Sequence, residues 1–502
     1  MADCRTGRRA EGKLESVHTA PDEPAHTRGL TLARQGGVAR GARRRPRLPG
    51  GDVPADVHNG HTSTFPLEGA PEPGSGPRRR VFPHTAGLGA VRPSGRGGLQ
   101  LAVLAAAAGA LVTALVMRHS GLDLDVYRAG ARALGKGHLL YSDAFDAGRR
   151  PHLLFTYPPV GALLAWPAAQ IPHLPAILCW NVATLTVLGW LIRLTAPALF
   201  APARPGQRLG SRTRLVVAVA LIAWTTPIID HLGFGQVNVF LLALCAADCL
   251  LPRTRWPRGL LVGAAAAVKL VPGIFIVYLL LTRRRRPALA AAASFVAITA
   301  LVWLAFPVAS QDFWLHALGR SSRIGDVGYF SNQSISGMLA RAGHAPGCLH
   351  LGLVAAAGAA GLWAARRSHA WGRPQAGFLL AGMTMNLVSP ISWMHHFVAL
   401  CLALVLLWQE GLASTGRRRA RLLGATVTAY VLLAARLPYL GDFLVRAGGA
   451  HALAVAARES YLLLTVAVMA VLFAAVAPHR PAPAAAAGRQ SARERAREAG
   501  VC

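Results

Sequence analysis

The sequence predicts an all-α polytopic membrane protein with about 11–13 transmembrane helices, and three observations lead to this fold class. First, 53% of the 502 residues are hydrophobic, above the roughly 45–50% of an average soluble chain. Second, apolar runs of about 15–22 residues recur from Leu99 onward, and a helix needs about 20 to cross a bilayer. Third, arginines gather in the breaks between these runs, as they do in cytoplasmic loops of membrane proteins.

The apolar runs are the predicted membrane segments. They cover 99–117, 154–172, 175–198, 214–230, 237–251, 259–281, 288–308, 348–365, 376–394, 396–412, 422–437 and 460–477. Two of them carry a predicted break. We expect 259–281 to be a hairpin of two half-helices interrupted near Lys269 and Pro272, and a portion of 154–198 to be re-entrant at Tyr157-Pro158-Pro159.

Composition divides the chain into three predicted domains. Residues 1–98 are basic and rich in Pro and Gly, and predict a disordered cytoplasmic extension. Residues 99–477 form the predicted transmembrane domain, and 478–502 a second disordered basic tail. The net charge of +31 does not indicate nucleic-acid binding, because clusters such as Arg283–Arg286 fall between apolar runs.

Charge also predicts the sidedness of the loops. The Arg-rich breaks near 199–214, 252–258, 283–286, 366–375 and 415–421 are assigned to the cytoplasm. The remaining gaps, 118–153, 231–236, 309–347, 389–396 and 438–459, are then extracytoplasmic. All six polar motifs described below fall on this outer side, which favours a single composite site.

Two carboxylates follow the first predicted span. They lie in the run Gly121–Arg128, which also contains Tyr127. A carboxylate at the membrane surface can act as a general base, since partial desolvation raises its pKa. The other interpretation is that Asp123 or Asp125 caps a helix over Val126–Leu134.

Three further motifs carry polar groups among apolar residues. Tyr157 lies in Phe155–Pro159, which is typical of a helix start as well as of a site. Gln236 and Asn238 either bind a polyhydroxylated ligand or satisfy a tight turn. Lys269 is flanked by apolar residues, so it is a candidate phosphate ligand, or it snorkels to the interface.

Two more motifs, in the later extracytoplasmic loops, complete the set of six. Asn332 and Gln333 follow an aromatic pair, an arrangement that suits sugar binding. His395 and His396 follow Trp393 and are interpreted as phosphate or sugar contacts, with Trp393 either in the site or an interfacial anchor. Neighbouring helical residues diverge by about 100° and no acidic residue or cysteine lies nearby, so no metal site is predicted. The seven cysteines show no metal spacing and predict no disulfides.

Taken in order, these motifs resemble the actinobacterial polyprenol-phosphate-mannose-dependent α-(1→2)-mannosyltransferase family, within the GT-C fold glycosyltransferases. The matching segments are Asp123–Tyr127, Phe155–Pro159, Gly235–Asn238, Lys269–Pro272, Asn332–Ser334 and Ser389–His396. The resemblance covers about 99–477. The basic extension before Leu99 does not belong to the family's pattern.

The resemblance implies a plasma-membrane enzyme that transfers a sugar from a polyprenyl-phosphate donor to a glycolipid or polysaccharide, with inversion, on the outer side. It implies that Asp123 is the general base, with Asp125 as the alternative. Lys269, Arg128 and His395 are the candidates that stabilise the departing phosphate. No cofactor and no metal is expected, because the leaving group carries a single phosphate.

Two other functions stay open on sequence grounds. One is transfer of arabinofuranose from decaprenyl phosphate, since similar proteins use that sugar. The other is a secondary transporter, which the break around Lys269 would suit. Transporters place their polar sites near the bilayer midplane, however, whereas the polar motifs here fall in the loops of one face.

Overall fold

The computed structural model describes residues 121–148, 153–201, 210–320, 323–448 and 451–478, and these are helical with one isolated antiparallel bridge between Asn332 and Trp393. The predicted extension 1–98, the first predicted span 99–117 and residues 479–502 lie outside the described residues. All described residues belong to one compact unit.

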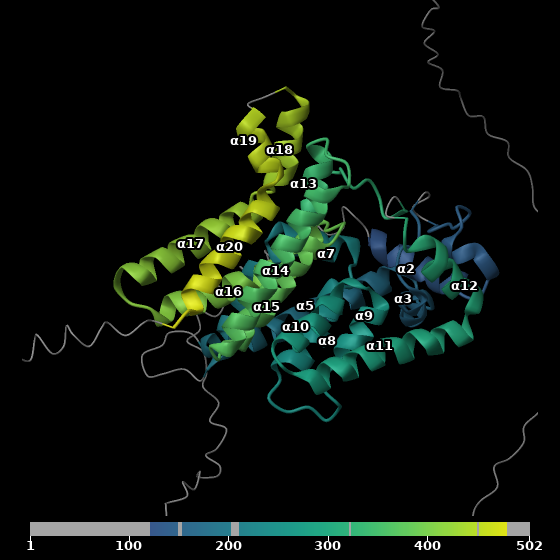
Figure 1. The fold of residues 1–502 in the computed structure, drawn as a ribbon, viewed down its shortest axis with the longest axis horizontal. Helices are drawn as coiled ribbons and strands as arrows, with labels where there is room; N and C mark the ends of the chain where they lie inside the picture. The colour runs from purple at the N-terminus through teal and green to yellow at the C-terminus, as the bar shows by residue number, and fades with distance from the viewer. Residues whose placement is uncertain (1–120, 149–152, 202–209, 321–322, 449–450, 479–502) are drawn as a thin grey trace, which may run out of the picture. The chain divides into compact units, whose positions relative to one another are not determined.

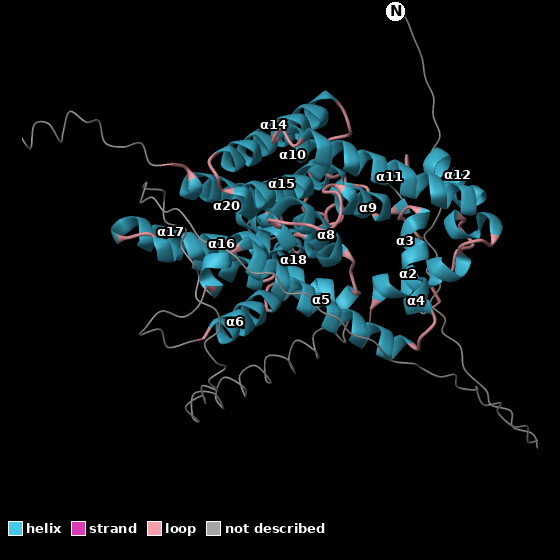
Figure 2. Cartoon of the chain, turned by 90° about the horizontal axis from the view of Figure 1, so that it is seen from below, coloured by secondary structure: helices cyan, strands magenta, loops and turns pink. Residues whose placement is uncertain are grey.

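The helices in the first half of the chain mostly form short elements. They are α2 (Leu122–Ala133), η1 (Gly137–Tyr141), α3 (Pro159–Leu164), α4 (Trp166–Ala169), α5 (His173–Thr195), η2 (Pro197–Phe200), α6 (Ser211–Ala223), α7 (Thr226–Phe234), α8 (Asn238–Leu250), α9 (Leu260–Val268), η3 (Val271–Gly273) and α10 (Ile274–Leu281). Helices α2 and α3 lie side by side in Figure 1, and Figure 2 shows α4 beside them.

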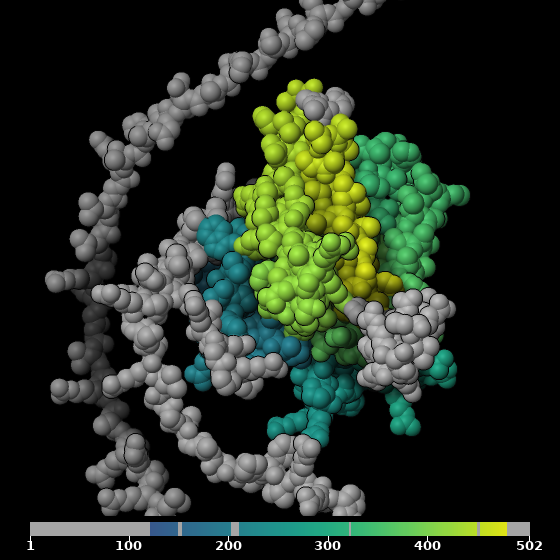
Figure 3. Space-filling model, turned by 90° about the vertical axis from the view of Figure 1, so that its left-hand side faces the viewer, coloured from purple at the N-terminus to yellow at the C-terminus, as the bar shows by residue number. Residues whose placement is uncertain are grey.

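Longer helices dominate the second half. They are α11 (Arg285–Ala305), α12 (Pro307–Gln311), η4 (Asp312–Ala317), α13 (Ile335–Arg341), α14 (Cys348–Ala370), α15 (Pro374–Val388), η6 (Met394–His396), α16 (Val398–Ala413), α17 (Gly416–Ala434), α18 (Leu437–Arg446), α19 (His451–Arg458) and α20 (Ser460–Val476). Helices α17 and α20 lie against each other and appear yellow-green and yellow in Figure 3.

Several of these helices can cross a membrane. In the described ranges α5, α11 and α14 are long and apolar enough, and the count rises to six if each of three bent pairs is one span. The bent pairs are α6–α7 (81°), α17–α18 (56°) and α19–α20 (72°). Helix α11 leaves Leu289, Leu301 and Leu304 more than 60% exposed, a face that suits lipid and not water. The chain is therefore a membrane protein.

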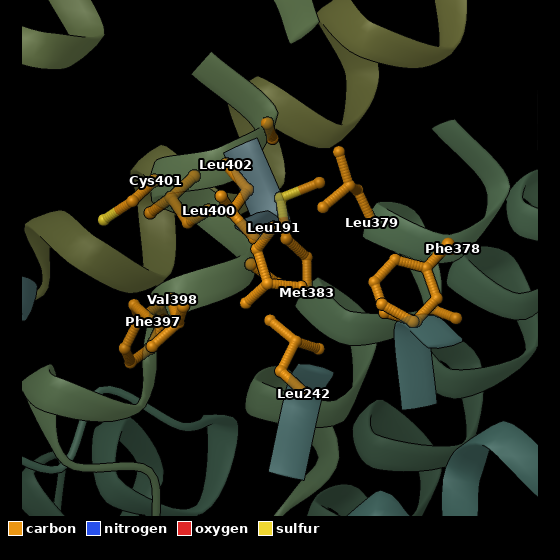
Figure 4. Close-up of a cluster of buried hydrophobic side chains, with 14 of the residues drawn as sticks. Leu191, Leu242, Phe378, Leu379, Met383, Phe397, Val398, Leu400, Cys401 and Leu402 are labelled. Carbon is orange, nitrogen blue, oxygen red and sulfur yellow. The ribbon is translucent and has the colours of Figure 1, made fainter. Parts of the chain in front are cut away.

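The core lies where α5, α8, α15 and α16 meet. Figure 4 shows Leu191, Leu242, Met383 and Leu400 converging there, and each is at most 5% exposed. Helix α16 is apolar on nearly every side, which is the pattern of a helix surrounded by protein. This packing fixes the helices whose ends carry the polar motifs.

Helix α9 is held firmly, which matters because it leads into Lys269. The carboxylate of Asp248 on α8 accepts hydrogen bonds from the backbone N–H groups of Leu261 (2.8 Å) and Val262 (3.0 Å) in the first turn of α9. Gly263 allows α9 to approach α11 closely, because a Cβ there would overlap the backbone of Ala291. Figure 2 shows the two helices side by side.

The predicted breaks occur where expected. Helix α9 ends at Val268, Lys269 is extended (φ −151°, ψ 125°), and Pro272 sits in the 3-10 turn η3 before α10 begins. Likewise α3 begins only at Pro159, and 154–172 forms two short helices instead of one span. Proline lacks a backbone N–H and cannot continue a helix from the preceding residues, which explains both positions.

Candidate active site

Two acidic residues lie in the first turn of α2. The helix begins at Leu122, and Gly121 precedes it in the left-handed region (φ 74°) without any side chain that caps the helix. The capping interpretation of Asp123 and Asp125 is therefore wrong, because the helix starts before both. Two positions apart, their side chains diverge by about 200° and meet different partners.

Asp123 begins a continuous chain of hydrogen bonds. Its Oδ2 accepts from Nε2 of Gln236 at 2.6 Å. Oε1 of Gln236 accepts from the hydroxyl of Tyr127 (3.2 Å) and from Nδ2 of Asn238 (3.3 Å). Oδ1 of Asn238 accepts from Nζ of Lys269 at 2.9 Å. A carboxylate and an ammonium group are thus joined through two side-chain amides.

Lys269 connects this chain to two further motifs. Its Nζ lies 3.3 Å from Nε2 of His396 and 5.1 Å from the centre of the Tyr157 ring. The hydroxyl oxygens of Tyr127 and Tyr157 lie 3.0 Å apart, within hydrogen-bond distance. We call the seven residues the polar cluster: Asp123, Tyr127, Tyr157, Gln236, Asn238, Lys269 and His396. They come from five separate segments of the chain.

The polar cluster has an accessible side and a buried side. Gln236 is 1% exposed and Tyr127 5% exposed, whereas Asp123, Asn238 and Lys269 are only half-buried. The buried amide and phenol hold the partly exposed groups in place. The carboxylate and the ammonium group are therefore fixed from behind, while part of their surface stays accessible.

Asp123 lies on α2, which is not among the helices able to span a membrane. Burial raises its pKa to about 6, against the Gln236 hydrogen bond and the Lys269 charge, which both lower the pKa. The carboxyl keeps some of its surface exposed, which limits the effect of burial. A pKa near the working pH suits a general base, which must gain and lose a proton readily.

Gly235 brings α2 and the Gln236 turn together. It ends α7 in the left-handed region (φ 70°), and a Cβ at this position would lie 2.8 Å from Cβ of Leu124. Trp180 secures the same turn from α5, because its indole N–H donates to the carbonyl of Gln236 at 3.1 Å. The turn can reach Asp123 only with glycine at position 235.

Asp125 lies apart from the polar cluster. It is 4% exposed, and its Oδ1 lies 2.8 Å from Nδ1 of His173 and 3.6 Å from Nη1 of Arg128. Arg128 in turn donates to the carbonyls of Ala168 (2.9 Å) and Ile171 (2.5 Å). The predicted site residues Asp125 and Arg128 thus attach α2 to α4 and to the start of α5.

Asn332 also lies outside the polar cluster, and protein groups occupy its side chain. Its Nδ2 donates to the carbonyls of Val327 (2.9 Å) and Pro390 (3.1 Å). Its Oδ1 accepts from the backbone N–H of Ser392 at 2.8 Å and of Ser334 at 3.3 Å. The residue is 0% exposed. It fastens the loop that precedes His395 and His396.

The next residue, Gln333, has a similar role. Its Nε2 donates to the carbonyls of Phe330 and Arg458, both at 2.7 Å, and its Oε1 accepts from the backbone N–H of Tyr461 at 3.0 Å. Its own N–H donates to the carbonyl of Ser392 at 2.9 Å. Gln333 therefore joins the histidine loop to the start of α20.

The remaining predicted residues flank His396. Trp393 pairs with Asn332 through the β-bridge and meets the ring of Tyr329 edge to face at 6.1 Å. His395 is 6% exposed and lies between the rings of Phe234 (5.0 Å) and His396 (4.8 Å). His396 reaches the polar cluster, and His395 packs behind it.

Four residues around the polar cluster carry no prediction from the sequence: Tyr141, His173, Trp180 and Asn386. Nδ2 of Asn386 donates to the carbonyl of His396 at 3.3 Å, and the hydroxyl of Tyr141 donates to the carbonyl of Tyr157 at 2.6 Å. A polar residue inside an apolar segment is a signal that could have indicated Asn386. The others have no such signal.

A small cavity lies beside Lys269. Its volume is about 30 Å³, the size of one water molecule. Asn238, Lys269, Asn386 and His396 line its polar side, and side chains such as Phe275 line its apolar side. The polar cluster therefore borders the apolar interior of the bundle, where a charged headgroup and an apolar chain can meet.

A helical membrane protein that holds a carboxylate, an ammonium group and an imidazole in one cluster has the features of a membrane-embedded group-transfer enzyme. A family model described as Glycosyltransferase family 87 matches residues 155–390. That match includes Tyr157, Gln236, Asn238 and Lys269. The matched stretch begins after Asp123 and ends before His396.

Curated relatives extend the match. The chain is 35% identical over 330 residues to a polyprenol-phosphate-mannose-dependent α-(1-2)-phosphatidylinositol mannoside mannosyltransferase of Mycobacterium tuberculosis, covering 62% of this chain and 75% of the relative. It is 34% identical over 336 residues to a polyprenol-phosphate-mannose-dependent α-(1-2)-phosphatidylinositol pentamannoside mannosyltransferase of Mycolicibacterium smegmatis, covering 64% and 77%. The chain belongs to glycosyltransferase family 87, and the resemblance noted from its motifs is confirmed. No solved structure matches the chain significantly.

Proposed function

We propose that the protein transfers mannose from a polyprenyl-phosphate-mannose donor to a mannose-bearing glycolipid or polysaccharide, forming an α-(1→2) linkage with inversion. The names of the relatives support mannose as the sugar and polyprenol phosphate as its carrier. They also favour a phosphatidylinositol mannoside as acceptor. The observation that carries the proposal is the chain of hydrogen bonds from Asp123 to Lys269.

In the proposed step Asp123 is the general base. It takes the proton from the acceptor hydroxyl as that oxygen attacks the anomeric carbon of the donor. The bond between the anomeric carbon and the phosphate oxygen breaks, and polyprenyl phosphate leaves with the electron pair. One carboxylate is enough for this reaction, because a phosphate departs without a strong general acid.

The residues at the Lys269 end of the polar cluster stabilise the negative charge that develops on the phosphate. Lys269 offers an ammonium group, and His396 and Asn238 lie within 3.3 Å of it. Fixed donors of this kind stabilise a leaving group without reorganising during the reaction. Gln236 separates base and cation, so that Lys269 does not neutralise the carboxylate by direct contact.

The contacts of four predicted residues suggest supporting roles. Asp125 and Arg128 would hold α2 in place, and Asn332 and Gln333 would hold the loop of His396. We propose that these residues position the polar cluster without touching the substrates. Tyr157 and Trp393 keep partly exposed rings and remain candidates for sugar contacts.

The proposed location is the plasma membrane, with the polar cluster on the extracytoplasmic side. Arginine-rich segments such as 283–286 and 417–419 favour this orientation through the positive-inside pattern. We further propose that 99–477 is the transferase domain, and that 1–98 and 478–502 are cytoplasmic extensions.

Membranes that contain the full chain test this function. They are supplied with radiolabelled polyprenyl-phosphate-mannose and a phosphatidylinositol mannoside, and labelled product is measured for wild type, Asp123→Asn and Asp125→Asn. We expect transfer by wild type, none by Asp123→Asn, and reduced but measurable activity with Asp125→Asn. Equal amounts of each protein in the membrane fraction are the control for folding.

Each result has a definite meaning. Full loss with Asp125→Asn and normal turnover with Asp123→Asn would move the base to Asp125 and overturn the scheme. If wild type transfers no mannose, decaprenyl-phosphate-arabinose is tested next as the donor. Failure with both donors would contradict the proposed function.

A further inference from the structure

A second polar pocket lies outside the polar cluster, between η1 and η4. Its volume is about 250 Å³, and its walls include Arg320, Arg323, His138, His316 and Asp312. The polar cluster uses none of these residues. The pocket is far larger than one water molecule, so it has room for a charged occupant.

The surroundings of Arg323 indicate that the occupant is an anion. Its side chain is only 11% exposed, and neither Nε nor Nη2 has a hydrogen-bond partner among the described residues. Its ion pair with Asp143, at 3.7 Å, involves a carboxylate that is 99% exposed. A buried guanidinium with two such nitrogen atoms is costly. Its planar fork matches the oxygens of a phosphate.

The other charges in the pocket leave room for an anion. Arg320 adds a second guanidinium. The carboxylate of Asp312 is already engaged, at 2.8 Å from Nδ1 of His138 and 4.0 Å from Nδ1 of His316. The arginines are therefore the groups that a phosphate would meet.

An apolar groove lies on the other side of η4. It has a volume of about 470 Å³ and is lined by Phe295, Val296, Trp303, Leu304 and Trp314, among others. Leu304 is 79% exposed and Val296 61% exposed. A groove lined in this way holds an alkyl chain favourably.

The π-helical turn η4 joins the two features. Asp312 and His316 face the polar pocket, whereas Trp314 faces the groove. Phe313 lies between them, 5.0 Å from the ring of Trp314 and 5.6 Å from that of Tyr141. π-helical turns are rare and often occur at functional sites.

We propose that pocket and groove together bind an anionic glycerophospholipid, with its phosphodiester at Arg320 and Arg323 and an acyl chain beside Trp314. This inference rests on the proposed function and assigns a site to the phospholipid part of its acceptor. Tyr141 lines the pocket and donates to the carbonyl of Tyr157 in the polar cluster. The acceptor phosphate and the donor phosphate at Lys269 thus have separate cationic sites.

Lipid binding tests the proposal without requiring catalysis. The purified full chain is incubated with phosphatidylinositol or with uncharged diacylglycerol, and retained lipid is counted by native mass spectrometry. We expect the double variant Arg320→Gln/Arg323→Gln to retain roughly tenfold less phosphatidylinositol, since two charge-assisted contacts are lost. Arg132→Gln, an exposed arginine on α2, is the matched control and should retain it fully.

Two outcomes of that experiment would overturn the proposal. Equal retention of phosphatidylinositol and diacylglycerol by wild type would mean that the groove takes any lipid. If inorganic phosphate binds wild type but not the double variant while both retain phosphatidylinositol equally, the pocket binds free phosphate only. Elution of the double variant as a monodisperse peak shows that its fold is intact.

A kinetic experiment separates this inference from the proposed function. The KM of a phosphatidylinositol dimannoside acceptor should rise roughly tenfold in the double variant. The KM of octyl α-mannoside, which lacks phosphate, and that of the donor should not change. An equal rise for both acceptors would contradict the phosphate site. No transfer by wild type to either acceptor would contradict the proposed function while leaving the binding result to stand.

Discussion

At the scale of single residues, the carboxyl group of Asp123 lies in surroundings that oppose its ionisation. Burial raises its pKa to about 6, and the Gln236 hydrogen bond is the strongest influence that lowers it. Below pH 6 the carboxyl is protonated and cannot accept a proton. The consequences can be measured in activity and in stability.

The first prediction concerns pH. For wild type, kcat/KM should fall about tenfold per pH unit on acidification below about pH 6, because the base becomes protonated. Gln236→Leu removes the hydrogen bond that lowers the pKa of Asp123. The acidic limb of the profile should therefore move to higher pH in that variant. An unchanged or lowered limb would contradict the role of Asp123 as base.

The second prediction concerns Asp123→Asn and stability. Because the folded pKa is raised above its ordinary value of 3.8, the ionised carboxylate opposes folding at pH 7. Asparagine avoids that charge, so the inactive variant should have a Tm at least equal to that of wild type at pH 7. As pH falls through 6 the carboxyl of wild type becomes neutral, and the difference in Tm should shrink. Differential scanning fluorimetry in detergent measures both.

The third prediction concerns Lys269. Replacing it with alanine removes the ammonium group that contacts Asn238 and His396. The KM of polyprenyl-phosphate-mannose should rise roughly 10- to 100-fold, the loss expected for a hydrogen bond to a charged group. Lys136→Ala, an exposed lysine outside the polar cluster, is the control. If Lys269→Ala leaves the donor affinity unchanged, the lysine does not bind the donor, and the interpretation that it snorkels to the interface is favoured.

At the scale of elements, a buried ion pair joins the loop region to the last helix. Arg341 at the end of α13 donates from Nε to Oε1 of Glu459 at 2.7 Å, and its Nη2 contacts Oε2. Nη1 donates to the carbonyls of Tyr329 and Asn332 at 2.9 Å. Both side chains of the pair are at most 6% exposed. This pair therefore secures the segment that orients the histidine loop.

The fourth prediction follows from that pair. Glu459→Ala leaves the guanidinium of Arg341 buried without its carboxylate, which costs about 3–5 kcal/mol. We expect a clear drop in the midpoint of thermal unfolding, with Asp442→Ala, which breaks an i,i+4 pair with the exposed Arg446, as the mild comparison. Equal effects of the two substitutions would show that the pair contributes little.

At the scale of the whole molecule, the sequence predicted the helical class, the membrane character and most element positions. Long apolar runs such as 348–365 and 396–412 correspond to α14 and α16, because lipid and core impose the same requirement on a run. The break at Lys269 was also predictable, since Pro272 cannot continue a helix. The described residues do not reach the expected 11–13 spans: three helices qualify, or six with bent pairs.

Only some of the site was predictable. Five motifs supply members of the polar cluster because unusual residues in apolar surroundings are visible in a sequence. The partners of Asn332 and Gln333 were not visible, because they are backbone carbonyls and N–H groups set by tertiary packing. In a sequence, a polar side chain that binds a ligand cannot be told from one that holds a loop in place through hydrogen bonds to the backbone.

The fifth prediction concerns metal ions. In the described segments of the chain no three His, Cys, Asp or Glu side chains lie close enough to hold a metal. We expect transfer to continue in excess EDTA, because the ammonium group of Lys269 supplies the positive charge at the leaving group. Strong inhibition that a divalent metal reverses would contradict the proposed chemistry.

Because the polar cluster comes from five separate segments of the chain, it is completed late during synthesis of the protein. His396 follows Lys269 by 127 residues, which a ribosome needs roughly 6–25 s to add. During synthesis Asp123 and Lys269 are therefore made well before the histidine loop exists. For that interval the ammonium group of Lys269 has Asn238 available but lacks the imidazole of His396. Fragments that end before residue 396 would stay catalytically silent even if every preceding helix had inserted.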